Sequence, residues 1–298
     1  MYPRSFEYTV AKSVDEACAL LAQHGDNARV LAGGQSLIPL MKLRLASPNY
    51  IIDIGNIAGL DGITEHGGEL RIGALATHSA VLDHQTVRQR WPLIADAVGV
   101  IADPQVRNWG TVGGALAEAD PAGDWGAVAM ALNARVRCLS PRGERFIDAE
   151  SLFVDAYTTK LAGDELIVEV IFPAPRQARA GAYLKLERRA GDFAVISVGV
   201  QLALSERDVC EDARIALAAA GLTPILARRA NEFLTGMQLN ATAIDEAAQL
   251  VAASSEPLAD IRGSEPYKRS AAAELFRDAL DLARKRSHGE EALAGHVR

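Results

Sequence analysis

Cysteine is scarce in this sequence: only Cys18, Cys138 and Cys210 occur among its 298 residues, and they stand far apart. Most iron–sulfur clusters need four cysteine thiolates, so these three cannot supply one. The histidines show no H-x-x-x-H spacing, and the nearest useful pair, His78 and His84, would not share a helix face. We therefore expect no metal site in this chain. Dispersed free thiols fit a reducing cytoplasm.

Long apolar runs and concentrated positive charge are also missing. No apolar stretch reaches the roughly 18 residues that a membrane helix needs. The first residues show no basic region followed by an apolar stretch, so no secretory signal is expected. The net charge is −7 and no Lys/Arg block stands out, which gives nucleic-acid binding little electrostatic support. We expect a cytoplasmic protein with no membrane span and no nucleic-acid partner.

The composition that remains is that of an ordinary globular protein, with 49% hydrophobic and 23% charged residues. The length suggests two domains or one large one. Residues 1–60 and 61–175 each mix short strands with helices, and Pro173-Ala174-Pro175 marks a boundary. In residues 176–298 strands come first and helices follow, which predicts an α+β domain.

Local patterns predict two helices and a C-terminal tail. Asp120 followed by Pro121 predicts an N-cap and a helix running from Pro121 to about Leu132. A single helix is expected from Ser79 to about Gln89. The last ten or so residues are polar and contain glycine, so we expect a loose tail there.

The first informative segment runs from Leu31 through Gly33-Gly34-Gln35-Ser36 into an apolar stretch. Here a strand enters paired glycines and a helix follows. Glycines let an anion approach the backbone amides, which can form an anion-binding nest. The helix N-terminus and the Ser36 hydroxyl suit a phosphate. The alternative is a simple strand-to-helix turn.

The second segment, Arg107 to Asp124, repeats this device with Gly113-Gly114 flanked by Thr111. Two such loops could hold the two phosphates of one dinucleotide. Asp124 could accept hydrogen bonds from ribose hydroxyls, or merely favour the helix dipole. Neither loop is the G-x-G-x-x-G fingerprint or a P-loop, which argues against an ordinary NAD dehydrogenase domain and against an ATPase. No G-x-S-x-G nucleophile elbow is present either.

A third segment runs from Tyr183 to Ala194. On a strand, Tyr183 and Lys185 would point to the same face. The ring could stack on a flat ligand and the lysine could hold a carbonyl or an anionic ring. A half-buried tyrosine beside a surface lysine is the alternative.

Together these segments resemble the FAD-binding medium subunit of the molybdenum hydroxylases, the family of xanthine dehydrogenase and carbon monoxide dehydrogenase. A-G-G-[QH]-S-L-x-P-x-M is present at 32–41, T-x-G-G-x-x-A-x-A-D-P-A-x-D at 111–124 and Y-x-K-x-x-R-x-x-G-D-[FW]-A at 183–194. The resemblance implies an α+β fold with a two-lobed FAD-binding module of the vanillyl-alcohol-oxidase type. Its lobes would be residues 1–60 and 61–175. A C-terminal domain with an antiparallel sheet and a helical bundle would follow at 176–298.

The resemblance also implies a set of cofactor-binding residues. The two glycine segments would bind the pyrophosphate, and Asp124 the ribityl or ribose region. The backbone at Ile167 would contact the flavin ring, Lys185 would reach its pyrimidine edge, Asp192 would lie near it, and Tyr183 would cover one face. The whole implied set is Leu31, Ala32, Gly33, Gly34, Gln35, Ser36, Leu37, Ile38, Ile101, Thr111, Val112, Gly113, Gly114, Ala115, Asp124, Ile167, Tyr183, Lys185 and Asp192.

The sequence departs from the family pattern at three positions. Gln35 and Glu118 stand where histidine is common, and Trp109 stands where arginine is frequent. The departures at Glu118 and Trp109 lie beside the second glycine segment, where they could change the flavin potential or partner docking.

The function that the resemblance implies is electron transfer within a heterotrimer. A large partner chain would carry the molybdopterin cofactor and a small one 2Fe-2S clusters, in a dimer of heterotrimers. FAD in this chain would take electrons from the clusters and pass them to an external acceptor. The alternatives are a self-sufficient FAD oxidase acting directly on a small organic substrate, or an assembly module without catalytic function.

Overall fold

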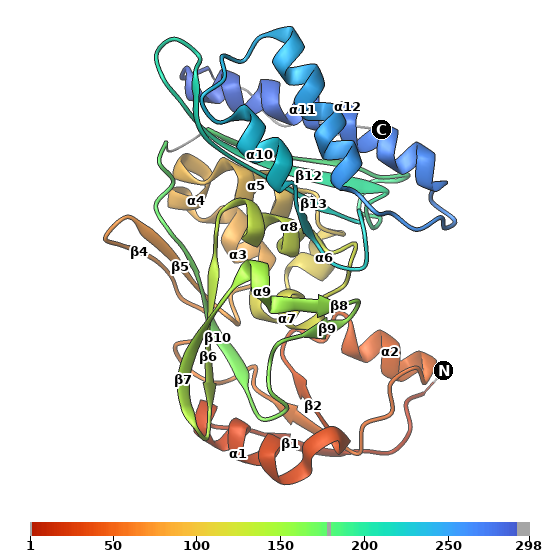
Figure 1. Ribbon diagram of the computed structural model, residues 1–298. Helices are drawn as coiled ribbons and strands as arrows, with labels where there is room; N and C mark the ends of the chain where they lie inside the picture. Colours follow the sequence, from red (N-terminus) through yellow and green to blue (C-terminus); the bar gives the residue numbers. More distant parts are fainter. Residues whose placement is uncertain (1, 178–179, 291–298) are drawn as a thin grey trace.

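The N-terminal part of the chain forms a small parallel sheet with two helices. The computed structural model describes residues 2–177 and 180–290. The strand order is β1-β3-β2, and this lobe lies at one end of the molecule (Figure 1). Its elements are β1 (Glu7–Val10), α1 (Val14–His24), a 3-10 turn (Gly25–Asn27), β2 (Ala28–Leu31), α2 (Leu37–Leu43) and β3 (Tyr50–Asp53).

Helix α1 begins where the sequence provides a cap. The Ser13 side chain accepts a hydrogen bond from the Glu16 backbone N–H, which satisfies one of the free donors of the first turn. Ala17, Cys18 and Leu21 face inward on consecutive turns and are buried. They join the lobe core with Ile52 and fasten the helix to the sheet.

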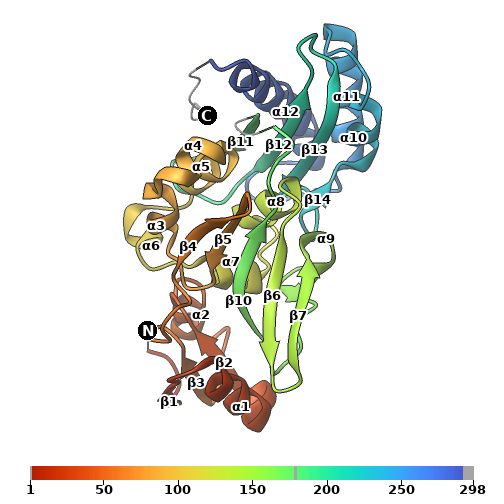
Figure 2. The ribbon, with the colours of Figure 1, turned by 90° about the vertical axis from the view of Figure 1, so that its left-hand side faces the viewer.

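The middle part is built on a five-stranded antiparallel sheet with the order β4-β5-β10-β6-β7, seen face-on in Figure 2. The strands are β4 (Ile63–His66), β5 (Glu69–Gly73), β6 (Arg135–Ser140), β7 (Gly143–Asp148) and β10 (Leu166–Phe172). The helices are α3 (His78–Asp83), α4 (Gln85–Arg90), α5 (Pro92–Gly99), α6 (Pro104–Arg107), α7 (Val112–Glu118), α8 (Asp124–Ala131) and α9 (Ala149–Leu152). A two-stranded ribbon, β8 (Phe153–Asp155) and β9 (Thr158–Thr159), completes it.

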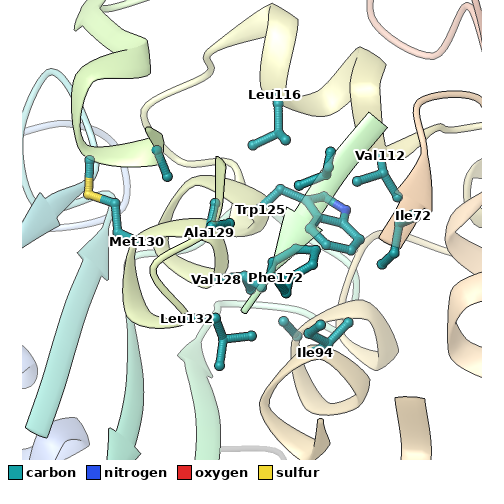
Figure 3. Close-up of a cluster of buried hydrophobic side chains, with 14 of the residues drawn as sticks. Ile72, Ile94, Val112, Leu116, Trp125, Val128, Ala129, Met130, Leu132 and Phe172 are labelled. Carbon is teal, nitrogen blue, oxygen red and sulfur yellow. The ribbon is translucent and has the colours of Figure 1, made fainter. Parts of the chain in front are cut away.

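Trp125 lies at the centre of the main core, in helix α8, all of whose residues are buried. Its ring packs against Phe172 of β10, with 6.4 Å between ring centroids. Ile72, Ile94 and Val112 line the same cluster (Figure 3). The buried helix α8 therefore holds its first residue, Asp124, in a fixed place.

The C-terminal part is an antiparallel sheet covered by helices (Figure 1). The strand order is β11-β12-β13-β14. Its elements are β11 (Gly181–Leu186), β12 (Ile196–Leu204), β13 (Cys210–Ala218), β14 (Ile225–Leu226), α10 (Arg228–Leu234), α11 (Ala241–Ser254) and α12 (Glu265–Ser287). These strands and helices share one core, with Phe276 and Leu280 of α12 fully buried. The α+β prediction is confirmed.

Two local expectations were wrong. Helix α8 begins at Asp124, because the Asp120 carboxylate accepts a hydrogen bond from the Ala122 N–H and closes a turn before it. The single helix expected after Ser79 is two, because His84 adopts an extended conformation with ψ 118° between α3 and α4. The expected loose tail falls largely on residues 291–298, which lie outside the described part of the chain. No helix of the described residues is long and apolar enough to span a membrane.

A buried ion pair joins the middle part to the C-terminal helix. The Arg286 guanidinium donates to both carboxylate oxygens of Asp96, at 2.6 and 3.0 Å. Asp96 also accepts a hydrogen bond from the Tyr183 backbone N–H at 3.1 Å. Burial raises the pKa of Asp96, although its pairing with Arg286 works in the opposite direction.

We expect Asp96→Asn to lower the free energy of unfolding by about 2 kcal/mol, because Arg286 loses the charge of its carboxylate partner in a buried place. Chemical denaturation measures this. Asp281→Asn is the matched control, since Asp281 pairs with Lys285 at the surface and should change stability by less than about 0.5 kcal/mol. Equal effects of the two variants would contradict a structural role for the buried pair.

Candidate functional site

The first glycine loop, residues 32–36, connects β2 to α2. The backbone N–H groups of residues 33–36 have no hydrogen-bond acceptor within residues 2–177 and 180–290. Gly34 has φ +72°, a conformation that other residues adopt at a cost. Gln35 and Ser36 are exposed. Four successive free amides in an accessible turn are donors arranged for an anion.

The second glycine loop, residues 109–114, lies directly against the first. A Cβ added at Gly33 would lie 1.9 Å from the carbonyl oxygen of Trp109 and 3.0 Å from Cα of Gly110. A Cβ added at Gly114 would lie 4.0 Å from Cβ of Ala32. The two segments predicted from the sequence therefore meet backbone to backbone, and only a glycine at position 33 permits this contact.

The second loop differs from the first in its hydrogen bonding. The N–H groups of Val112 and Gly113 donate to carbonyl groups of residues 76 and 74, at 3.1 and 2.9 Å. The Gly114 N–H donates to Oγ1 of Thr111 at 3.2 Å. These bonds hold α7 to the end of β5. The first loop consequently supplies most of the free amide donors.

Asp124, Tyr183 and Lys185 come together in one buried network between α8 and β11. The Tyr183 hydroxyl lies 2.7 Å from Oδ1 of Asp124 and 2.7 Å from Oγ of Ser197. Lys185 Nζ donates to Oδ2 of Asp124 and to the carbonyl oxygen of Val100, both at 3.2 Å.

Burial sets the electrostatics of this network. It raises the pKa of Asp124, and the nearby Lys185 charge opposes that rise. Burial and the Asp124 charge raise the pKa of Tyr183 well above its ordinary value, so the phenol stays protonated. Lys185 thus compensates a carboxylate that has little access to water.

Two of these residues are almost fully enclosed by the protein. Tyr183 is 1% exposed and packs against Gly199. The Lys185 side chain is 2% exposed, and its ammonium group is surrounded by protein acceptors rather than directed at an open surface. Both residues instead position Asp124 and join α8 to β11.

Asp192 organises the loop after β11. It accepts a hydrogen bond from the Phe193 backbone N–H at 2.8 Å and pairs with Arg262 and Arg188 at 3.4 Å each. These donors lower its pKa, against the opposing effect of its partial burial. The neighbouring Phe193 ring is 49% exposed.

The remaining expected residues fall into two groups. Ile38 is exposed, and Leu31, Leu37, Ile101 and Ala115 are half-buried, so their surfaces are partly accessible to a ligand. Ile167 is buried beside an irregularity of the β10–β6 ladder.

Comparison with known proteins agrees with this arrangement of loops. A sequence model described as the FAD binding domain in molybdopterin dehydrogenase matches residues 4–175. A second, the CO dehydrogenase flavoprotein C-terminal domain, matches residues 181–283. The chain belongs to the FAD-binding subunits of the molybdenum hydroxylases.

Relatives in this family are medium chains of dehydrogenases. The carbon monoxide dehydrogenase medium chain of Hydrogenophaga pseudoflava is 40% identical over 95% of this chain and 98% of its own length. The nicotine 6-hydroxylase medium subunit of Paenarthrobacter nicotinovorans is 37% identical over 93% and 96%.

Solved structures of the family share the fold. Carbon monoxide dehydrogenase from Hydrogenophaga pseudoflava superimposes with a TM-score of 0.93 at 40% identity, covering 96% of this chain and 99% of the other. Quinoline 2-oxidoreductase from Pseudomonas putida 86 gives 0.90 at 32% identity, covering 98% and 100%. The sequence resemblance is confirmed, and FAD is the cofactor of this chain.

The three departures from the family pattern lie at or near the glycine loops. Gln35 donates weakly to the carbonyl oxygen of Gly33, at 3.4 Å. The Trp109 side chain is 67% exposed. Burial, with the charge of Asp120 as a second cause, raises the pKa of Glu118. Nothing in the structure explains the choice of tryptophan at position 109.

One residue that sequence reasoning considered only as a metal ligand lies beside the glycine loops. His78, the first residue of α3, donates its backbone N–H to the Gly110 carbonyl oxygen at 3.0 Å. No spacing motif links it to the glycine segments. The bridge between Thr77 and Thr111 and the backbone hydrogen bonds beside it bring the two parts of the chain together.

The cysteines of this FAD-binding subunit are chemically shielded. All three are buried, and burial is the main cause that raises the pKa to about 11 for Cys18, about 12 for Cys138 and about 11 for Cys210. Since thiolate is the reactive form, we expect no rapid labelling of the native protein by a thiol reagent at pH 8. Denatured protein should label at three sites. Rapid labelling of any native cysteine would contradict this.

Proposed function

We propose that this chain is the electron-transfer subunit of a heterotrimeric molybdenum hydroxylase, taking electrons from iron–sulfur clusters of a partner chain and passing them to an external acceptor. The observation that carries the proposal is the pair of glycine loops. Four unpaired amides at residues 33–36 lie where the second loop packs against Gly33. This arrangement fits the diphosphate of a dinucleotide.

The residues of the loops bind and orient the cofactor in this proposal. The amides of residues 33–36 donate to phosphate oxygens, and the Ser36 hydroxyl has no competing partner in the described chain. Thr111 offers its own N–H and its hydroxyl hydrogen, because its oxygen already accepts from Gly114. Charge-assisted hydrogen bonds of this kind are stronger than neutral ones.

The chemistry that bound FAD supplies is the exchange of electrons singly or in pairs. The chain contributes rigidity. Asp124 is held by Tyr183 and Lys185 between the middle and C-terminal parts, so those parts keep one relative position. Leu31, Leu37, Ile38, Ile101, Ala115, Ile167 and Asp192 are proposed to line the remaining path of the cofactor.

The partners follow from what this chain lacks. Three buried cysteines cannot hold a cluster, so the proposal requires a small chain with 2Fe-2S clusters and a large chain with the molybdopterin cofactor. We propose a dimer of such heterotrimers, located in the cytoplasm. Relatives named for carbon monoxide and nicotine leave the substrate class open.

Purification with co-purifying chains from the native host tests this proposal. We expect flavin absorption near one FAD per chain, together with molybdenum, iron and two further polypeptides. A chemical oxidant or reductant added to this complex should change the flavin and cluster bands together. Flavin on a lone chain that a small organic molecule reduces directly would instead indicate a self-sufficient oxidase. Absence of flavin even after FAD is added would contradict both.

A further inference from the structure

His78 is fixed to the second glycine loop by its backbone. Its N–H donates to the Gly110 carbonyl oxygen at 3.0 Å, and the Val112 N–H donates to the Ala76 carbonyl oxygen at 3.1 Å. These bonds flank the bridge between Thr77 and Thr111. The backbone of His78, a residue that is only 5% exposed, is therefore held against the loop.

Trp125 determines which imidazole nitrogen carries the proton. The indole Nε1–H lies 3.2 Å from Nδ1 of His78 in the buried interior. An indole N–H can only donate, so Nδ1 must accept with its lone pair. The hydrogen of the neutral ring is consequently on Nε2.

The Nε2–H group has no acceptor among residues 2–177 and 180–290. Some unpartnered side-chain atoms of this protein are sealed from solvent, but Nε2 of His78 is not one of them. Solvent can therefore reach this nitrogen. A buried ring whose one donor is free and accessible is an unusual feature, since most polar groups in such positions are paired.

The free donor lies close to the contact between the two glycine loops. A Cβ added at Gly110 would be 2.8 Å from both Nε2 and Cδ2 of His78. Gly110 in turn borders Gly33, whose added Cβ would be 3.0 Å from Cα of Gly110. Gly110 thus lies between the imidazole edge of His78 and Gly33, where the free amides begin.

We propose that His78 donates its Nε2–H to the FAD diphosphate at the contact between the glycine loops, as a donor whose tautomer Trp125 fixes. This inference rests on the proposed function, because it assumes that the loops hold that diphosphate. It assigns a binding role to a residue outside all three sequence motifs.

The donor is neutral over the physiological pH range. Burial, followed by the charge of Arg107, lowers the pKa of His78 to about 4. The ring therefore offers a hydrogen bond without a net charge. Its contribution to FAD affinity should not change between pH 6 and pH 8.

Two substitutions separate the two ring nitrogens. His78→Asn can place an acceptor near the Nδ1 position and so keep a partner for Trp125, but it does not reach the Nε2 position. His78→Gln can place an N–H near the Nε2 position. Each variant is purified with its co-purifying chains, stripped of FAD and titrated with FAD, and the flavin fluorescence gives the dissociation constant. ADP, which carries the diphosphate without the flavin, is measured by competition.

We expect His78→Asn to lower the affinity for both FAD and ADP by about tenfold, which corresponds to about 1.4 kcal/mol. The melting temperature should change little. His78→Gln should retain affinity within about threefold of the unsubstituted protein. The inference is overturned if the His78→Asn variant binds both ligands with normal affinity, or if His78→Gln binds them no more tightly than His78→Asn. It is also overturned if His78→Asn loses affinity for FAD but not for ADP. If the unsubstituted protein binds neither ligand, the proposed function itself has failed, which is a distinguishable outcome.

Discussion

Gly33→Ala is expected to weaken FAD binding by about 100-fold while the protein remains folded. The added methyl group would lie 1.9 Å from the Trp109 carbonyl oxygen, which is backbone and cannot rotate away. The two glycine loops must therefore separate. Overpacking of this kind costs about 1–3 kcal/mol, and misplaced charge-assisted hydrogen bonds add about 1.5–3 kcal/mol each. With one misplaced hydrogen bond the two costs span about 2.5–6 kcal/mol, a range that contains the roughly 2.7 kcal/mol of a 100-fold change.

The fold should survive because Gly33 is half-buried in the loop between β2 and α2, outside any helix or strand. The measurement is the FAD dissociation constant by fluorescence titration, with far-ultraviolet circular dichroism as the check on folding. Gly62→Ala is the matched control, since a Cβ there meets nothing within 4 Å. Normal FAD affinity in Gly33→Ala would contradict the proposal that the contact between the loops builds the cofactor site.

The sequence predicted the parts of this site better than their arrangement. The paired glycines of both loops stand in local patterns, strand then glycines then helix, and such patterns depend only on neighbouring residues. The contact between Gly33 and Trp109 depends on how the N-terminal and middle parts pack, which no local pattern contains. The same holds for His78, which a bridge between Thr77 and Thr111 brings to the second loop.

Burial was the property that local reasoning judged least well. Tyr183 and Lys185 are two residues apart on a strand and share a face, and in many strands one face is buried and the other exposed. Five of the six residues of β11, however, are buried on both faces: Tyr183 joins the main core, and Ala182 and Leu184 join the core shared with α12. A strand covered on both faces gives no period-two signal. The polar side chains therefore turned out to form an internal network.

The starts of helices also depend on packing that the local sequence does not contain. Ser13 caps α1, because its side chain accepts a hydrogen bond from the Glu16 N–H only three residues later. Asp120 resembles a cap equally well in the sequence, yet its carboxylate binds the Ala122 N–H and forms a turn instead. Both bonds are local and similar in strength, and the surrounding packing of α8 decides between them.

Lys185→Met is expected to lower the free energy of unfolding by about 3–5 kcal/mol at pH 7, the usual cost of breaking a buried ion pair from one side. The ammonium group lies 3.2 Å from Asp124 and 3.8 Å from Glu187, and all three side chains are at most 7% exposed. Methionine fills much of the volume but leaves these carboxylates without the cation. Chemical denaturation measures the loss.

The matched control for this variant is Lys285→Met. Lys285 pairs with Asp281 at 2.7 Å, but the two side chains are 49% and 56% exposed, so the change should be at most about 0.5 kcal/mol. The double variant Lys185→Met with Asp124→Asn should recover part of the stability, because the second substitution removes the unpaired charge.

The loss of stability in Lys185→Met should also depend on pH. The sign of this dependence follows from the direction in which the pKa of Asp124 is shifted. Burial raises the pKa of Asp124 in the folded protein above its unfolded value of about 3.9, and Lys185 opposes that rise. Without the lysine, the folded pKa rises further. A group with a raised folded pKa stabilises the fold fully below its unfolded pKa, and this contribution is lost as pH rises through the folded pKa. The loss of stability in Lys185→Met should therefore be largest near pH 8 and shrink toward pH 5.

The double variant, which lacks the Asp124 carboxylate, should show less of this pH dependence. A deficit below about 1 kcal/mol that stays constant with pH would mean that Lys185 contributes packing rather than charge to the network.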